Sequence, residues 1–158
     1  MECHEPRGRI LMVEDEEQVR KPIRLNLTKA GYEVLEVSNG AEAIMVMEAD
    51  PGAVMVDTIL CDIRMPRASG LEAITYFREH YPFVPIVVLT GYPDVELAAS
   101  LMKQGVLDYL TKPVTREELL TVIERCVDQH GLFSTIHSRL PEPSPASGSR
   151  TPGTDAEG

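Results

Sequence analysis

Five short apolar runs, separated by longer segments in which apolar residues recur at helical spacing, constrain the fold of this chain most strongly. The runs lie at residues 10–13, 34–37, 58–61, 86–90 and 107–110. Runs of this kind predict strands, and strands that alternate with helices pair in parallel through right-handed crossovers, with helices on both faces of the sheet. The sequence therefore predicts five βα units in an open, doubly wound α/β sheet.

Two of the intervening segments carry clear apolar stripes. The stripes expected to be buried are Val19, Ile23, Leu27 and Ala30 in the first helix, and Val95, Ala98, Ala99 and Met102 in the fourth. Leu97 and Leu101 fall off the second stripe, where an exposed contact patch and partial core packing remain open alternatives. Pro22 lies inside the first helix and is expected to kink or shift it, because proline cannot donate a main-chain hydrogen bond.

Glycines mark the expected ends of three helices. Gly31, Gly105 and Gly131 follow the first, fourth and fifth helical segments, where a left-handed residue is commonly needed. With Gly131 as the last boundary, the chain divides into an N-terminal extension at residues 1–7, one domain at residues 8–131 and a flexible, Pro/Ser/Gly-rich tail at residues 132–158.

Charge and hydrophobicity exclude several classes of function. The net charge of −10 would repel a phosphate backbone, so direct nucleic-acid binding is not expected. The longest uninterrupted apolar stretch, residues 43–47, is far shorter than the roughly 20 residues of a membrane span, and the N-terminus lacks the apolar run of a signal peptide. A cytoplasmic protein without membrane contact is the prediction.

Functional groups collect at the carboxyl ends of the predicted strands, where open α/β sheets bind their ligands. The residues found there are Glu14, Asp15, Asp62, Thr90 and Lys112. Carboxylates in one crevice repel each other unless a cation joins them, and an oxygen-lined site with few protein ligands suits Mg²⁺. The Lys112 ammonium and the Thr90 hydroxyl suit phosphoryl oxygens, and one of the carboxylates is a candidate phosphoryl acceptor.

Four segments carry a resemblance to a known family. They read RILMVEDE at residues 9–16, ILCDIRMPRASGLE at 59–72, PIVVLTGY at 85–92 and DYLTKPV at 108–114. In this order and at these separations they resemble the receiver domain of bacterial two-component response regulators, over residues 8–131. The resemblance implies a flavodoxin-like fold, with five parallel strands in the order 2-1-3-4-5 and five helices.

The resemblance also assigns roles to the residues at the strand ends. It implies that Asp62 accepts a phosphoryl group from the phosphohistidine of a sensor histidine kinase or phosphotransfer protein, while Thr90 and Lys112 contact the phosphoryl oxygens. The implied Mg²⁺ ligands are Glu14, Asp15, Asp62 and the main-chain carbonyl of Arg64. Pro113 corresponds to the cis-proline of the family. The domain would then not be an enzyme in the ordinary sense, since it would catalyse only its own phosphorylation and dephosphorylation.

The implied readout is a conformational change. Thr90 turns toward the phosphoryl group and Tyr109 moves from an exposed to a buried position, which alters the surface of the fourth helix, fifth strand and fifth helix. The output is expected to be contact with an as yet unknown downstream protein, with a phosphorylation-dependent homodimer as a further expectation. Bulky groups at Arg64 and Tyr92 lead to the hypothesis of a long-lived phosphorylated form.

Four other functions compete with this interpretation. A flavodoxin-type binding module would need a hydroxyl- and glycine-rich phosphate loop where Glu14 to Glu17 stand, and an aspartate-nucleophile phosphatase commonly has a second aspartate where Arg64 stands. A receiver that acts only as an unphosphorylated scaffold and the N-terminal fragment of a multidomain regulator stay open as alternatives.

Overall fold

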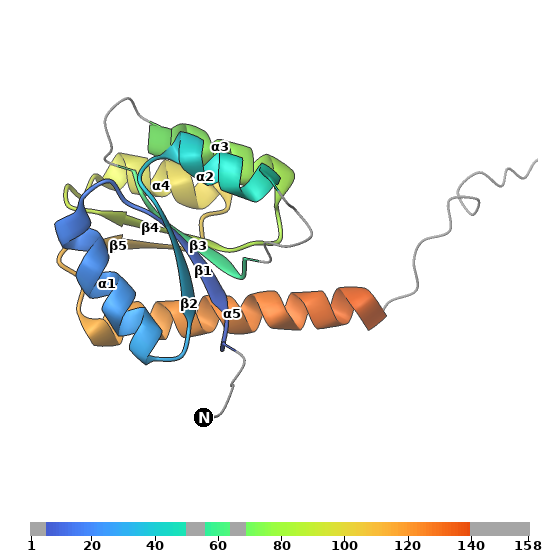
Figure 1. Cartoon of the computed structure of the whole chain (residues 1–158). Coiled ribbons are helices and arrows are strands. Elements are labelled where there is room, and N and C mark those ends of the chain that lie inside the picture. Colours follow the sequence, from blue (N-terminus) through green and yellow to red (C-terminus); the bar gives the residue numbers. More distant parts are fainter. Residues whose placement is uncertain (1–5, 50–55, 64–68, 140–158) are drawn as a thin grey trace, which may run out of the picture.

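The computed structural model describes residues 6–49, 56–63 and 69–139 of the chain (Figure 1). The strands are β1 (Arg9–Val13), β2 (Glu33–Val37), β3 (Thr58–Asp62), β4 (Ile86–Thr90) and β5 (Asp108–Thr111). The helices are α1 (Glu17–Lys29), α2 (Gly40–Ala49), α3 (Ser69–His80), α4 (Val95–Gln104) and α5 (Arg116–Arg139). The predicted alternation of strands and helices is confirmed.

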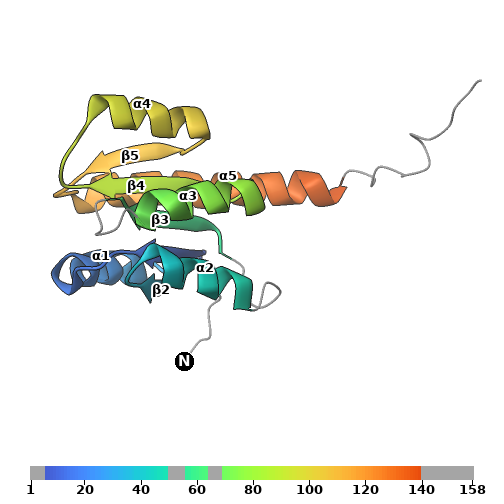
Figure 2. The same cartoon turned by 90° about the horizontal axis from the view of Figure 1, so that it is seen from above.

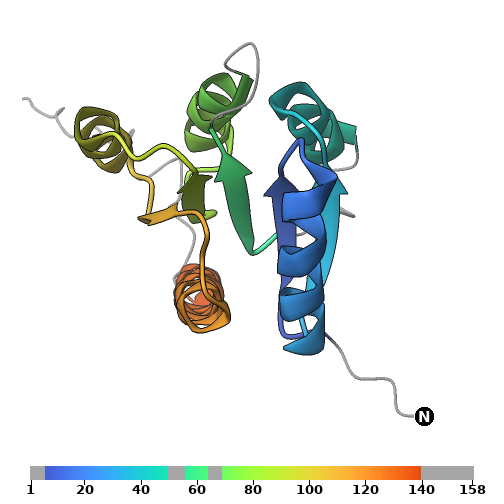
Figure 3. The ribbon, with the colours of Figure 1, turned by 90° about the vertical axis from the view of Figure 1, so that its left-hand side faces the viewer.

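The five strands form one parallel sheet in the order β2-β1-β3-β4-β5. Helices α1 and α5 cover one face, and α2, α3 and α4 cover the other, as Figure 3 shows along the sheet and Figure 2 shows from above. This confirms the doubly wound, flavodoxin-like fold. Because all strands run in the same direction, their carboxyl ends meet at one edge.

Two apolar clusters, one on each face, form the core. The cluster beneath α1 and α5 contains Ile10, Met12, Ile23, Leu27, Leu60, Leu89, Leu119 and Ile123. The cluster beneath α2, α3 and α4 contains Leu11, Val13, Ile59, Ile74, Phe77, Val88 and Leu101. Side chains alternate between the two clusters along each strand, and β3 and β4 are buried at every position. This double burial explains why these strands appear in the sequence as continuous apolar runs.

Helix α1 follows its predicted stripe. Ile23 and Leu27 are buried, and Val19 and Ala30 pack half-buried beside them. Pro22 lies inside α1, which begins at Glu17 and runs to Lys29, so the proline does not end the helix, and the expected kink or shift stays a prediction. Pro22 is exposed, so the main-chain hydrogen bond that it cannot donate is missing at a position near solvent.

Helix α4 presents the opposite face from the one predicted. Leu101 is fully buried and Leu97 packs half-buried against the core, whereas Val95 is 85% exposed and Met102 is 47% exposed. The predicted stripe was ambiguous because apolar residues occur almost all round this helix. The two leucines bury more apolar area than the alanines of the competing stripe, so they decide the orientation.

Helix α5 continues beyond its predicted end. Gly131 lies inside the helix, which runs to Arg139 and projects past the sheet (Figure 1 and Figure 2). Glycine in a helix costs only about 1 kcal/mol relative to alanine, which is too little to end an otherwise favourable helix. Gly31 and Gly105 do adopt the predicted left-handed conformation, with φ of 102° and 104°. The rest of the predicted tail, residues 140–158, and residues 1–5 of the extension lie outside the described residues.

Within the described part of the chain, no helix has the length and apolar character to cross a bilayer.

Candidate functional site

The carboxyl edge of the sheet brings the predicted residues into one place. Asp62 and Thr90 end β3 and β4, and Glu14 and Lys112 follow β1 and β5 directly. Strands β1, β3 and β4 are adjacent in the sheet, and β5 is next to β4. The side chains of Glu14, Asp62 and Thr90 are buried at this edge, with exposures of 1%, 3% and 1%.

Lys112 lies between two buried carboxylates. Its Nζ is 3.0 Å from Asp62 Oδ2, to which it donates a hydrogen bond, and 3.1 Å from Glu14 Oε1. Burial acts to lower the pKa of Lys112, but the hydrogen bond and charge of Asp62 together with those of Glu14 outweigh burial and raise this pKa. The lysine is therefore a permanent cation at neutral pH. The peptide bond between Lys112 and Pro113 is cis, as the resemblance implied.

Glu14 is held at its main chain and its side chain. Its N–H donates to Val37 O at 3.1 Å, and its Oε2 accepts a hydrogen bond from the Glu16 N–H at 3.2 Å. Its buried Oε1 meets Lys112 as an ion pair but accepts no aligned hydrogen bond among the described residues. Burial, followed by the charge of Asp62, raises the pKa of Glu14. The carboxylate thus lies in a site that has more negative charge than one lysine balances.

Three carboxylates form a group suited to a cation. Oxygens of Glu14, Asp15 and Glu16 all lie within 4.8 Å of one another, and Asp15 and Glu16 are exposed. Hard oxygen donors that open to solvent fit Mg²⁺, which keeps several waters. A bound cation would give Glu14 Oε1 a further partner and would lower the raised pKa of Glu14. The predicted Arg64 carbonyl lies outside the described residues.

The two predicted switch residues, Thr90 and Tyr109, have defined hydrogen-bond partners. Thr90 Oγ1 accepts a hydrogen bond from the Tyr92 N–H at 3.1 Å and is 3.4 Å from Tyr92 O. Tyr109 is half-buried, and its hydroxyl accepts a hydrogen bond from the Asp94 N–H at 3.1 Å. The Asp94 side chain in turn caps α4 by accepting from the Leu97 N–H. The two predicted switch residues therefore both contact the segment that leads into α4.

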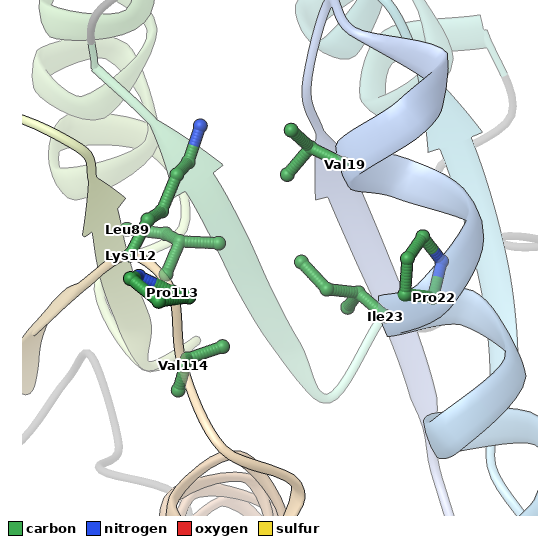
Figure 4. Close-up of a pocket in the computed structure, with 7 residues that line it drawn as sticks. All are labelled: Val19, Pro22, Ile23, Leu89, Lys112, Pro113 and Val114. Atoms are coloured by element: carbon green, nitrogen blue, oxygen red, sulfur yellow. The ribbon is translucent and has the colours of Figure 1, made fainter.

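An apolar pocket opens next to the site, between α1 and the chain that follows β5. Its volume is about 380 Å³, and Figure 4 shows residues of α1 facing Leu89 and the Lys112–Val114 segment across it. The lining residues are Val19, Pro22, Ile23, Leu89, Lys112, Pro113 and Val114. Lys112 thus contributes to the pocket wall while its ammonium contacts Asp62.

Sequence reasoning missed two residues at this edge. Glu16 was not among the predicted site residues, yet its carboxylate belongs to the acidic group and makes no side-chain cap for α1. The acidic run 14–17 was the available signal for it. Arg20 donates a hydrogen bond to the main-chain carbonyl of Glu14 at 2.8 Å, and no sequence motif pointed to it.

Curated proteins similar to this chain are regulatory proteins of greater length. Regulatory protein AtoC of Escherichia coli (strain K12) is 34% identical over 129 residues, covering 82% of this chain and 27% of AtoC. DNA-binding transcriptional regulator NtrC of the same organism is 30% identical over 124 residues, covering 78% of this chain and 26% of NtrC. The chain thus spans about a quarter of the length of these relatives.

Solved structures and the family model agree on the domain. A response regulator receiver domain protein from Clostridium thermocellum matches with a TM-score of 0.73 and 28% identity, covering 80% of this chain and 98% of that one. The signal receiver domain of a putative Luxo repressor protein from Vibrio parahaemolyticus shares the fold, with a TM-score of 0.74, 22% identity and coverage of 82% and 96%. The response regulator receiver domain model matches residues 10–124. With this match, and with the predicted acids, hydroxyl and lysine at one edge of a sheet in the order 2-1-3-4-5, the chain belongs to the response regulator receiver domain family.

Proposed function

We propose that Asp62 accepts a phosphoryl group from the phosphohistidine of a sensor histidine kinase or phosphotransfer protein. The observation that carries this proposal is the position of Lys112 Nζ, 3.0 Å from Asp62 Oδ2 and 3.1 Å from Glu14 Oε1 at a buried sheet edge. An Asp62 oxygen bonds to phosphorus as the bond from phosphorus to the donor nitrogen breaks, and the electron pair of that bond stays on the imidazole. Lys112 then offsets the charge of the transferred group.

Mg²⁺ is the proposed cofactor, and Glu14, Asp15, Asp62 and the Arg64 carbonyl are its proposed protein ligands. When bound, it supplies positive charge that stabilises the phosphoryl oxygens during transfer. The exposed Asp15 leaves room for water, and Glu14 keeps its orientation through the Glu16 N–H and Lys112. Glu16 is a further carboxylate of the same group.

The phosphodonor protein is proposed to dock over the pocket between α1 and the Lys112–Val114 segment. The pocket is apolar and adjoins Lys112, so a donor covering it would reach Asp62 and exclude water from the transfer. The proposed output is a movement of Thr90 toward the phosphoryl group, which breaks its hydrogen bond with Tyr92 and changes the surface of α4, β5 and α5. The downstream target is proposed to be a protein, with a homodimer of the phosphorylated form as a further candidate.

Intact mass after incubation with acetyl phosphate and Mg²⁺ tests the phosphoacceptor. Wild type is expected to gain one phosphoryl group, and the gain should disappear in Asp62→Asn or with EDTA. The matched control is Asp57→Asn, which removes the acid at the opposite end of β3 and should leave the gain intact. Folded wild type that binds Mg²⁺ but gains no mass would overturn the proposal and favour the scaffold function.

A further inference from the structure

Arg20 joins three segments around the acidic loop. Its guanidinium donates to Glu14 O at 2.8 Å, contacts Glu17 Oε1 at 2.6 Å and lies 3.2 Å from Glu36 Oε1. These partners belong to the loop after β1, to α1 and to β2 respectively. The Arg20 side chain is only 17% exposed, so the contacts form in a partly desolvated position where hydrogen bonds to charged groups are stronger than in water.

The carbonyl that Arg20 holds belongs to the peptide joining Glu14 to Asp15. A peptide group is planar, so a hydrogen bond to its oxygen restricts the position of the next Cα, here that of Asp15. On the other side of the same residue, the Glu14 N–H is fixed to Val37 O. The two main-chain contacts therefore set how the chain leaves β1, and with it the directions in which both acidic side chains point.

Arg24 provides an internal comparison one helical turn later. Its Nη1 contacts both carboxylate oxygens of Glu36 at 3.0 Å, the same acid that Arg20 contacts. Arg20 and Arg24 thus share an ion-pair partner, and their side chains are 17% and 31% exposed. Arg20 differs from Arg24 in its contacts with Glu14 O and Glu17, because the contacts described for Arg24 are with Glu36 alone, and of these two only Glu14 O belongs to the Glu14–Asp15 peptide.

We infer that Arg20 is a positioning residue for the Mg²⁺ and phosphoryl site, acting through the Glu14–Asp15 peptide. The inference rests on the proposed function of that site. Arg20 touches neither phosphorus nor metal in this role. It keeps the two acids in the orientation that a cation needs, so removing it should weaken metal binding while leaving the reacting groups in place.

The test compares Arg20→Met with Arg24→Met, which both keep an unbranched stem and remove a cation that faces Glu36. Calorimetry with Mg²⁺ alone should show a dissociation constant raised about tenfold in Arg20→Met, the size expected when a group that orients metal ligands is lost. Arg24→Met should keep the dissociation constant within about twofold of wild type, because the contacts described for Arg24 do not reach the Glu14–Asp15 peptide and partly exposed charges act only weakly at a distance. With acetyl phosphate, Arg20→Met should need more Mg²⁺ for half-maximal rate, yet reach close to the wild-type rate at saturation.

A metal-free readout separates positioning from general loss of stability. The ¹⁵N resonance of the Asp15 amide reports the hydrogen bond to its own peptide carbonyl, and it should move in Arg20→Met but not in Arg24→Met. Should Arg20→Met not fold, Arg20→Lys replaces it, because one ammonium cannot hold the carbonyl and Glu36 together as a guanidinium does. Equal Mg²⁺ affinity in the Arg20 and Arg24 variants, or an unmoved Asp15 amide, would overturn the inference. Wild type that takes up neither Mg²⁺ nor a phosphoryl group would instead overturn the proposed function.

Discussion

The two ends of β3 each carry an acid, and the two acids have opposite surroundings. Asp57 precedes the strand, and its oxygens accept a hydrogen bond from the Arg9 N–H at 2.8 Å and contact His130 Nδ1 at 2.9 Å. Burial acts to raise the pKa of Asp57, but the hydrogen bonds from His130 and Arg9 outweigh it and hold this pKa below 3.8. Asp62 ends the strand and shares one lysine with the buried Glu14.

The difference separates an acid that is fully paired within the fold from the acid proposed to accept a phosphoryl group. Asp57 has a donor for each oxygen and ties α5 to the amino edge of the sheet. At the carboxyl edge, Glu14 and Asp62 share Lys112, Glu14 also belongs to the acidic group with Asp15 and Glu16, and the Glu14 pKa is raised. Asp57 is partly buried and Asp62 is buried, so both acids are withdrawn from water and burial alone does not separate their roles. What distinguishes the carboxyl edge is an excess of negative charge, which a bound cation can balance.

The largest expected effect comes from removing the shared cation. Lys112→Met leaves two buried carboxylates without their ion pair, so the free energy of unfolding should fall by about 2 kcal/mol in EDTA at pH 7.5. Urea unfolding measures this loss, and added Mg²⁺ should recover part of it. Lys103→Met, on the exposed surface of α4, is the control and should change stability by less than about 0.5 kcal/mol. Equal stabilities of the two variants would contradict the inference that Lys112 balances the two buried carboxylates.

A smaller loss of stability is expected at the other end of the strand. Asp57→Asn weakens two hydrogen bonds to a charged acceptor, which should lower the free energy of unfolding by about 1.5 kcal/mol. Asp62→Asn should lower the free energy of unfolding by less than Asp57→Asn does, or should raise it, because the substitution removes the repulsion between Asp62 and Glu14. Chemical denaturation in EDTA compares the two variants directly. The comparison between the two ends of β3 breaks down if Asp62→Asn is the more destabilised variant.

The smallest expected effect is a difference in acid sensitivity. The pKa of Asp57 is lower in the folded protein than in the unfolded chain, so the folded protein binds fewer protons at acid pH. The stability that Asp57 contributes is therefore present above pH 3.8 and is lost as the pH falls through the lower folded-state pKa. Melting temperatures of wild type and Asp57→Asn should converge as the pH is lowered from 5 toward 2. A difference in melting temperature that stays constant over this pH range would contradict the lowered pKa of Asp57 in the folded protein.

The fold was predictable because its strongest signals are local. Strands β3 and β4 are buried on both faces, and this burial requires continuous apolar runs that are visible in the sequence. Helix α4 was oriented wrongly because its apolar residues surround the helix, and only packing distinguishes Leu101 from Met102. Gly131 was misread as a helix end because a local propensity was given more weight than the helical context.

The candidate site was predictable where parallel strands end and unpredictable where distant segments meet. Topology alone brings Asp62, Thr90 and Lys112 to one edge, so their proximity could be predicted from their positions in the chain, whereas the roles implied for them by the resemblance stay predictions. Asp57 gave no signal, because its partner His130 is 73 residues away along the chain. Arg20 gave none either, since its main-chain contact with Glu14 depends on the path of a loop.

The hydrogen bond between Thr90 Oγ1 and the Tyr92 N–H has a consequence for how strongly the domain can respond. Under the proposed function, Thr90 leaves the Tyr92 N–H, from which its oxygen accepts, and donates its hydroxyl proton to a phosphoryl oxygen on Asp62. The response therefore depends on the difference between these two hydrogen bonds. A difference on the order of 1 kcal/mol changes the ratio of two conformations only about fivefold. The output would then be graded: a downstream protein would read the fraction of domains in the second conformation, and its own affinity for that conformation would supply the rest of the response.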